Sequence, residues 1–147
     1  MKNKKFIGPV YKESEAFILA NFYEKNSQSI LYIGKDDIEI NSVENKLKWL
    51  LPNDLIFNFR SWDQIPYDLV SPSKEIQLER IKTLYYLNLI NKKKIVLTTI
   101  NAVLQKTLYK DFILKNSFEI YENKKIKFND LISKLLLLGY ERTSVVR

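Results

Sequence analysis

The chain contains no cysteine and no histidine among its 147 residues. Without thiols it forms no disulfides, and without either residue type it lacks the usual nitrogen and sulfur ligands of zinc. The same absence excludes thiolate nucleophiles and histidine-based acid-base catalysis. We therefore expect a protein that has no disulfides and no metal site.

Long apolar runs are missing as well, because none reaches the length of about 20 residues that a membrane-spanning helix needs. The first residues, MKNKKFIGPVYKESE, contain no apolar signal-peptide core. The composition, with 46% apolar and 28% charged residues, is typical of a globular protein. A length of 147 residues fits one domain and is too short for a motor with two nucleotide-binding lobes. We expect a soluble, cytoplasmic monomer with no membrane contact.

Basic residues outnumber acidic ones, and the formal net charge is +7. Such a charge favours phosphate binding through the release of counterions. The lysines, however, gather in short clusters at residues 2–5, 92–94 and 124–127, a pattern typical of solvated turns. We favour a solvated surface over a specific DNA groove. A small nucleic-acid-binding protein that uses Trp62, Tyr67 and these lysines is kept as an alternative.

Apolar periodicity predicts helices that alternate with short strands. Helices are expected from Glu15 to Lys25, from Asp36 or Asp37 to Pro52, and over residues 73–89, 101–108, 109–114 and 130–138. Strands are expected over residues 30–33, 55–59, 95–100, 118–121 and 140–146. Buried strands joined through helices form βαβ units, whose strands are parallel. The fold class is therefore α/β, with a mostly parallel sheet flanked by helices.

Polar residues and one glycine predict where several helices begin and end. Ser14, Ser73 and Asn129 stand where N-caps belong, and Gly139 stands at the C′ position of the last helix.

Three parts are expected along the chain. These are a loose segment over residues 1–12, an α/β domain over residues 13–128, and the start of a following, truncated domain over residues 129–147. The last predicted strand ends with the chain, which suggests a fragment cut at a domain boundary.

A phosphate-binding loop is expected to be degenerate. The pattern G-x-x-x-x-G-K-[ST] surrounds phosphates with backbone N–H groups and a lysine at a helix N-terminus. The one candidate window begins at Gly8 and reads GPVYKESE, with Glu13, Ser14 and Glu15 where the pattern requires glycine, lysine and a hydroxyl. Two carboxylates at a helix N-terminus repel phosphate. We expect no nucleotide cofactor, although Lys12 and Ser14 leave a marginal anion contact open.

No other catalytic set is apparent in the sequence. The acidic residues lie on separate loops or helix starts, where capping explains most of them. Ser71 and Ser73 have no histidine to activate them. Thr98 and Thr99 follow the best strand, where open α/β sheets bind ligands, but strand propensity explains them as well.

The segment from Phe59 to Ile81 carries the most specific pattern in the chain. It reads W-D-x-x-P-Y-D-x-x-S-P-x-x-x-I-x-x-x-R, formed by Trp62, Asp63, Pro66, Tyr67, Asp68, Ser71, Pro72, Ile76 and Arg80. The prolines restrict the backbone, so that large rings and carboxylates share a stiff loop. Such a loop suits a binding surface, while the simpler interpretation is that Trp62 packs as a lid on the core.

This pattern resembles the amino-terminal module of bacterial transcription-repair coupling factors, whose first domain is similar to that of the excision-repair protein UvrB. The likeness continues in IVLTTINAVLQ (residues 95–105) and LLLLGYERTSVV (residues 135–146), and it covers roughly residues 29–147. The resemblance implies a RecA-like or UvrB-like α/β fold that lacks the Walker A loop. Too few residues separate Trp62 from Ser73 for the DNA-clamping hairpin of UvrB.

The resemblance also implies a function. Coupling factors are ATP-dependent DNA translocases that remove stalled RNA polymerase from DNA and recruit UvrA for nucleotide excision repair. Their motor lies outside the region matched here, so this chain is expected to be a noncatalytic scaffold and interaction module, not an enzyme. UvrA binding is expected to need residues beyond Arg147. The alternative is a nucleotide-dependent helicase or UvrB-type fragment.

Overall fold

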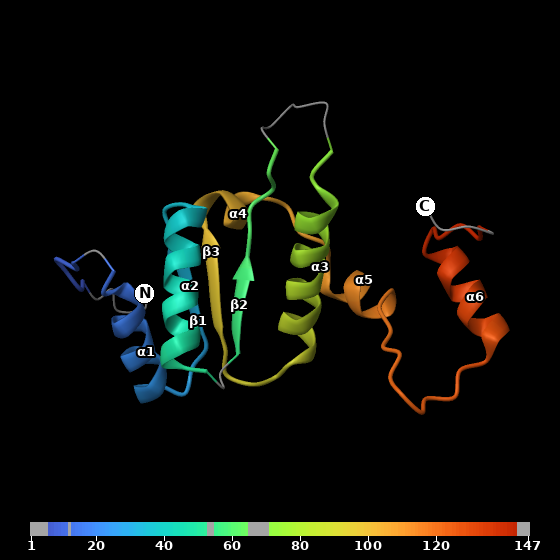
Figure 1. The fold of residues 1–147 in the computed structure, drawn as a ribbon, viewed down its shortest axis with the longest axis horizontal. Coiled ribbons are helices and arrows are strands. Elements are labelled where there is room, and N and C mark those ends of the chain that lie inside the picture. Colours follow the sequence, from blue (N-terminus) through green and yellow to red (C-terminus); the bar gives the residue numbers. More distant parts are fainter. Residues whose placement is uncertain (1–5, 12, 53–54, 65–70, 144–147) are drawn as a thin grey trace. The chain divides into compact units, whose positions relative to one another are not determined.

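A computed structural model describes residues 6–11, 13–52, 55–64 and 71–143 of the chain. The chain divides into two compact units, residues 1–108 and 109–147. The first unit contains α1 (Glu15–Lys25), β1 (Ile30–Gly34), α2 (Asp37–Leu50), β2 (Ile56–Phe59), α3 (Lys74–Leu89), β3 (Ile95–Thr99) and α4 (Ile100–Leu104). The second contains α5 (Lys110–Lys115) and α6 (Phe128–Leu137). Figure 1 shows these elements.

The three strands form one parallel sheet in the order β1-β3-β2. Ile30 of β1 and Ile56 of β2 both lie opposite Ile95 of β3, which fixes the register of the sheet. Figure 1 shows β3 in the middle and α3 beside β2, on the side away from β3. The predicted α/β class and parallel sheet are confirmed.

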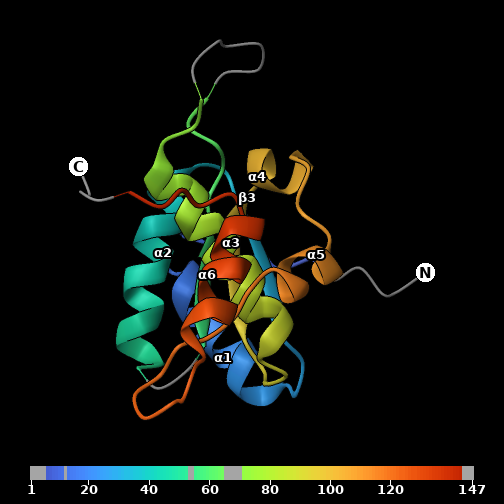
Figure 2. The same cartoon turned by 90° about the vertical axis from the view of Figure 1, so that its right-hand side faces the viewer.

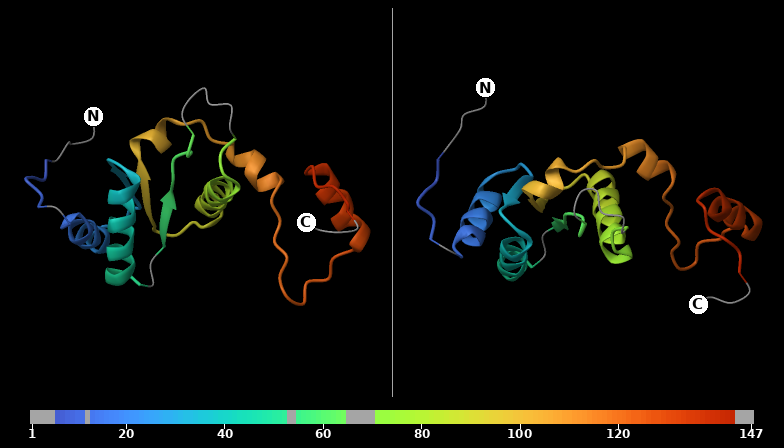
Figure 3. Two further views of the ribbon diagram at one scale, coloured as in Figure 1. Left: turned by 45° about the horizontal axis from the view of Figure 1, so that its top comes forward. Right: turned by 90° about the horizontal axis from the view of Figure 1, so that it is seen from above.

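Helices α1 and α2 cover one face of the sheet, and Figure 2 shows α2 standing on that face. Viewed from above, α1 lies toward the β1 end of the sheet and α3 at the β2 end (Figure 3), whereas α2 packs against all three strands. The core of the unit lies between the sheet and these two helices. Its buried members are Ala16, Ala20, Tyr23, Ile40, Val43, Leu47, Leu51, Ile95 and Leu97.

Gly34 ends β1 because α2 passes close to it. A Cβ atom at this position would lie 2.7 Å from Cδ1 of the buried Ile40 and 3.1 Å from Oε1 of Glu39. Only glycine leaves room for this approach without a shift of the Ile40 side chain or of the helix that carries it. The glycine therefore positions the first turn of α2 at the carboxyl end of β1.

Several predicted helix boundaries are confirmed by their hydrogen bonds. The Asp36 carboxylate accepts from the backbone N–H of Glu39 at 2.9 Å, and the Ser73 hydroxyl accepts from that of Ile76 at 3.4 Å. Gly139 follows α6 with φ +87 and donates its N–H to the Leu136 carbonyl at 3.0 Å. That is a left-handed C′ glycine, as the sequence predicts.

One predicted cap lacks its side-chain bond, and another is wrong. Ser14 occupies the N-cap position of α1, but its hydroxyl makes no capping bond and donates to the Tyr11 carbonyl at 2.6 Å. Asn129 lies inside α6, whose N-cap position is held by Lys127 without a side-chain cap. The helix expected over residues 101–108 is also shorter, since α4 ends at Leu104.

Two predicted strands are not formed in the described residues. Residues 118–121 have no regular structure, and neither do residues 140–143, while residues 144–146 lie outside the described part. A strand needs a neighbour for its backbone N–H and carbonyl groups. The described residues of the second unit include no other strand that would provide one, so apolar alternation alone does not produce a strand there.

Candidate functional site

The position of the degenerate phosphate loop lies just before α1. Ser14 occupies the N-cap position of that helix with a helical backbone, and Glu13 beside it has φ +78. Lys12 lies outside the described residues. Gly8 is exposed, with no atom within 4 Å of the position of a Cβ. The described residues of this window therefore form no cradle of converging backbone N–H groups around Gly8.

A groove of about 350 Å³ lies beside the first turns of α1 and α2. Four carboxylates line it, together with the single ammonium group of Lys35 among the described residues. The four are Glu13, Glu15, Asp36 and Glu39. Lys46 pairs with Glu13 at 3.4 Å, but four clustered carboxylates still repel a phosphate more strongly than these two lysines attract it, so the groove is unsuited to a nucleotide triphosphate.

Glu39 is held in this groove by two donors. Its Oε1 accepts a hydrogen bond from the Tyr32 hydroxyl, and its Oε2 accepts one from the backbone N–H of Lys35 at 3.2 Å. Burial, followed by the hydrogen bond and charge of Glu39, raises the pKa of Tyr32 above its ordinary value. Tyr32 therefore stays protonated and keeps the Glu39 carboxylate in place.

The proline-aromatic segment is closed at its base. The Asp63 carboxylate accepts from the backbone N–H of Ser73, at 3.2 Å to Oδ1 and 3.3 Å to Oδ2. Hydrogen bonds from Ser73, first from its side chain and then from its backbone N–H, lower the pKa of Asp63. Gln77 donates its side-chain amide to the Pro72 carbonyl at 2.7 Å. These contacts join the two ends of the loop to the start of α3.

Arg80 connects α3 to β2 and to the residues that follow β2. Its side chain is buried, and its Cζ lies 4.2 Å from the ring centroid of Phe59 and 4.1 Å from that of Trp62. Its Nη1 donates to the Arg60 carbonyl and, at 3.1 Å, to Oε1 of Gln105. A buried guanidinium between two aromatic faces gains cation–π energy as well as hydrogen bonds. We call Phe59, Trp62, Arg80 and Gln105 the arginine cluster.

Gln105 is the member of this cluster that the sequence reasoning missed. Its Oε1 also accepts from the backbone N–H of Trp62 at 3.0 Å, so one amide oxygen holds both Trp62 and Arg80. Gln105 is the last residue of the motif IVLTTINAVLQ, and its place in that motif was the sequence signal that could have identified it. The geometry of Trp62 and Arg80 agrees with the structural interpretation of the loop. Both residues make their contacts at the described base of the loop.

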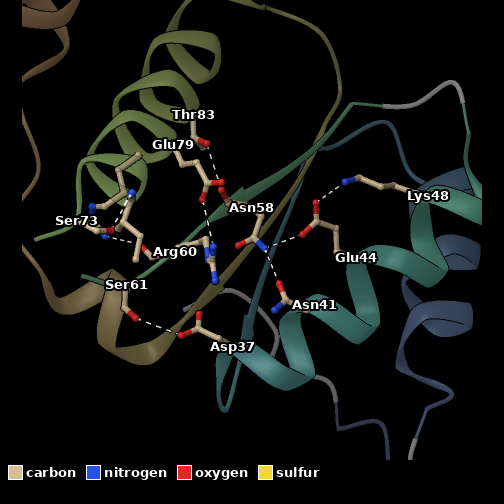
Figure 4. Close-up of polar contacts among 12 residues, drawn as sticks. Asp37, Asn41, Glu44, Lys48, Asn58, Arg60, Ser61, Ser73, Glu79 and Thr83 are labelled. Carbon is tan, nitrogen blue, oxygen red and sulfur yellow. Dashed lines mark hydrogen bonds and ion pairs between the residues drawn. The ribbon is translucent and has the colours of Figure 1, made fainter. Parts of the chain in front are cut away.

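A second groove, of about 410 Å³, runs between α2 and α3 over β2. Figure 4 shows its polar contacts, in which Asn58 donates to Glu44 at 2.6 Å and to Asn41 at 3.4 Å. Arg60 donates to Glu79 at 3.4 Å. The Oδ1 atom of Asn58 is buried without a hydrogen-bond partner among the described residues. These contacts link Asn58 to α2 and Arg60 to α3, which fits a structural network.

Of the remaining predicted site residues, the structure describes some, and others lie outside the described part of the chain. Thr98 donates its hydroxyl to the Phe59 carbonyl at 2.8 Å, and the Thr99 hydroxyl caps α4, so the structure gives both threonines structural roles. Ser71 is exposed. Pro66, Tyr67 and Asp68 lie outside the described residues. In the described part of the chain, no three acidic residues gather as a metal site, and no helix is long and apolar enough to cross a membrane.

Comparison with known proteins gives a consistent set of relatives. The chain is 30% identical over 128 residues to a transcription-repair-coupling factor of Rickettsia bellii and 30% identical over 132 residues to one of Borreliella burgdorferi. It is 19% identical over 143 residues to one of Escherichia coli. These matches cover 87%, 88% and 97% of this chain but only 11%, 11% and 12% of the relatives. No family model matches the chain.

Proposed function

Because the chain belongs to the family of transcription-repair coupling factors, we propose that it is a noncatalytic scaffold and interaction module of that family. Residues 13–128 form the UvrB-like body in this proposal, and residues 129–147 begin the following domain. The chain spans only 11% of its relatives, so DNA translocation, removal of stalled RNA polymerase and UvrA recruitment belong to the longer protein. Its cellular site in the proposal is the cytoplasm.

The acid-lined groove beside α1 and α2 carries the proposal. A working nucleotide site places backbone N–H groups and a lysine around the phosphates, whereas this groove presents the carboxylates of Glu13, Glu15, Asp36 and Glu39. Binding a triphosphate there would bring like charges together in a partly enclosed space. This supports a module that holds partners and does not turn over nucleotide.

Calorimetric titration of the 147-residue chain with MgATP tests the noncatalytic part. We expect no binding at millimolar nucleotide, and a Glu13→Gln/Glu15→Gln variant should gain some affinity because it removes two repelling charges. The matched control is Glu119→Gln, an exposed carboxylate of the second unit that does not line the groove. Micromolar binding by the unaltered chain would contradict the proposal.

Affinity capture of purified UvrA tests the interaction part. The chain alone should capture little UvrA, and a fusion to the segment that follows the matched region in the Rickettsia bellii relative should capture it. The role of Trp62, Asp63, Pro66, Tyr67, Asp68, Ser71, Pro72 and Arg80 as a partner-binding loop is part of the same proposal. A fusion that fails to bind UvrA would argue against recruitment through this region.

A further inference from the structure

Arg80 carries a buried positive charge that has no counter-charge among the described residues. The residue is only 2% exposed, and no ion pair between described residues includes it. Burial lowers the pKa of Arg80, and no described carboxylate acts against that effect. Buried charges in proteins are normally paired, because an unpaired charge is costly. The described part of the fold therefore leaves this charge for an anion from elsewhere to neutralise.

Part of the guanidinium group of Arg80 is not used by its described neighbours. Arginine has five N–H donors, and both of its hydrogen bonds to described residues, to the Arg60 carbonyl and to Oε1 of Gln105, come from Nη1. The rings of Phe59 and Trp62 lie over the group. The edge formed by Nε and Nη2 therefore remains, and its two parallel N–H groups have the geometry that binds both oxygens of one carboxylate.

A pocket of about 300 Å³ lies beside Arg80, between α3 and the segment that follows α4. Lys106 lies exposed at its rim, and the described residues that line the pocket include no carboxylate. The apolar part of the wall consists of Trp62, Ile81, Leu84 and Leu108. A buried arginine beside an apolar pocket is suited to an anion that carries apolar groups.

We propose that this pocket binds an acidic side chain of a partner polypeptide, with the carboxylate on the Nε–Nη2 edge of Arg80 and a neighbouring apolar side chain against the apolar wall. A carboxylate carries one negative charge, which matches the single buried charge, whereas a phosphate group brings nearly two. Lys106 adds little to this balance, because its charge is exposed to water. The apolar wall favours a carboxylate on a polypeptide over a free, hydrated anion. The inference rests on the proposed interaction role, for which it names the chemistry of one contact.

Titration of the 147-residue chain with short peptides, followed by NMR, tests this contact. The probe is acetyl-Leu-Glu-Leu-amide, and its matched control is acetyl-Leu-Gln-Leu-amide, which has the same shape and no charge. The glutamate peptide should shift the resonances of the Arg80 Nε–H and the Trp62 indole N–H. The glutamine peptide should bind at least about tenfold more weakly, because it loses the charge-assisted hydrogen bonds. Acetate and inorganic phosphate at the same concentration should shift these resonances far less, since neither can use the apolar wall.

Two variants separate the arginine from the apolar wall. Arg80→Lys keeps the charge but loses the planar fork, so it should weaken binding of the glutamate peptide at least about tenfold, with the melting temperature showing that the chain is folded. Leu108→Ala leaves the arginine cluster intact and should weaken binding about fivefold through lost apolar contact. Leu89→Ala is the matched control. Leu89 is 50% exposed, close to the 46% of Leu108, and does not line the pocket.

Three results would overturn this inference and leave the scaffold function standing. Absence of binding by the glutamate peptide, or equal binding by the glutamine peptide, would show that the pocket does not recognise a carboxylate. Acetate or phosphate binding as tightly as the glutamate peptide would make the site one for a small anion. An unchanged affinity in Leu108→Ala would remove the pocket as the binding surface. The MgATP titration and the UvrA capture test the proposed function separately, because neither depends on this pocket.

Discussion

The two outer strands of the sheet, β1 and β2, have opposite environments. The carbonyls of Asn58 on β2 and of Arg60 after it are bonded by Thr83 and Arg80 of α3, whereas the outward backbone groups of Leu31 and Ile33 on β1 have no such partner in the described residues. Phe59 on β2 is buried, while Leu31 on β1 is mostly exposed. This difference between the two strands places most of the specific packing of the unit outside its core on the β2 side. On the β1 side, the apolar side chains of Leu31 and Ile33 stay exposed.

Arg80→Ala should have the largest effect, and it tests the packing of α3 on the β2 side of the sheet. This change should lower the free energy of unfolding by about 3 kcal/mol, because it removes a buried side chain and leaves the Arg60 carbonyl without the donor that Arg80 supplies. Urea denaturation measures it. Arg60→Ala is the control, since the exposed Arg60–Glu79 pair should contribute less than about 0.5 kcal/mol. Equal small losses for both variants would contradict the role of the arginine cluster.

A smaller loss is expected for Thr83→Val. The change keeps the shape of the side chain and deletes only the donor to the Asn58 carbonyl, so it should cost about 1 kcal/mol. The exposed Thr107 provides the matched change, Thr107→Val, which should stay within about 0.5 kcal/mol. If both variants melt alike, the hydroxyl of Thr83 does not secure the edge of β2.

The clamp between Asp63 and Ser73 should respond to pH. Hydrogen bonds from Ser73 lower the pKa of Asp63 below its ordinary value of 3.8. A lowered folded-state pKa means that the clamp contributes at neutral pH and is lost only as pH falls through that lower value. The NMR shift of the Ser73 amide should therefore titrate with a midpoint below 3.8. Asp63→Asn should abolish this titration, and a midpoint at or above 3.8 would show that the clamp is absent in solution.

The smallest change in stability is expected for a substitution on β1, at the exposed edge of the sheet. Ile33→Thr should change the free energy of unfolding of the isolated chain by less than about 0.5 kcal/mol, because the side chain is already half in water. Thermal and urea denaturation measure this change. A loss above about 1 kcal/mol would show that Ile33 is covered in solution, and the contrast between the two edges would then fail.

The sequence predicts the layered part of the fold well because its signals are local. Ile95 to Thr99 is a β-branched apolar run, and Asp36 and Ser73 cap helices through bonds to residues three positions away. Gly139 stops α6 for a similar local reason. The strand expected over residues 118–121 fails because a strand depends on a partner, and apolar alternation does not report whether one is present.

The candidate site is less predictable because its contacts join distant residues. Trp62 and Arg80 belong to one sequence pattern, but Gln105, which bonds both, lies 43 residues after Trp62. Nothing in the spacing of Arg80 distinguishes a buried guanidinium between two rings from an exposed basic residue of a helix. The sequence of the degenerate phosphate loop contains the first two carboxylates of the groove, Glu13 and Glu15. The other two, Asp36 and Glu39, come from the N-cap and first turn of α2, so only the fold brings them to the groove.

The pairing of α3 with β2 has a consequence for insertions and deletions. Arg80 and Thr83 are three residues apart on the helix, and the carbonyls they bond belong to Arg60 and Asn58, two residues apart along the neighbouring strand. One residue added to α3 ahead of Arg80 would rotate the following turns by about 100° and carry both donors away from their carbonyls. Chains of this family should therefore keep a constant length between Ser73 and Thr83, and variation in length should be tolerated better in the exposed connections between elements.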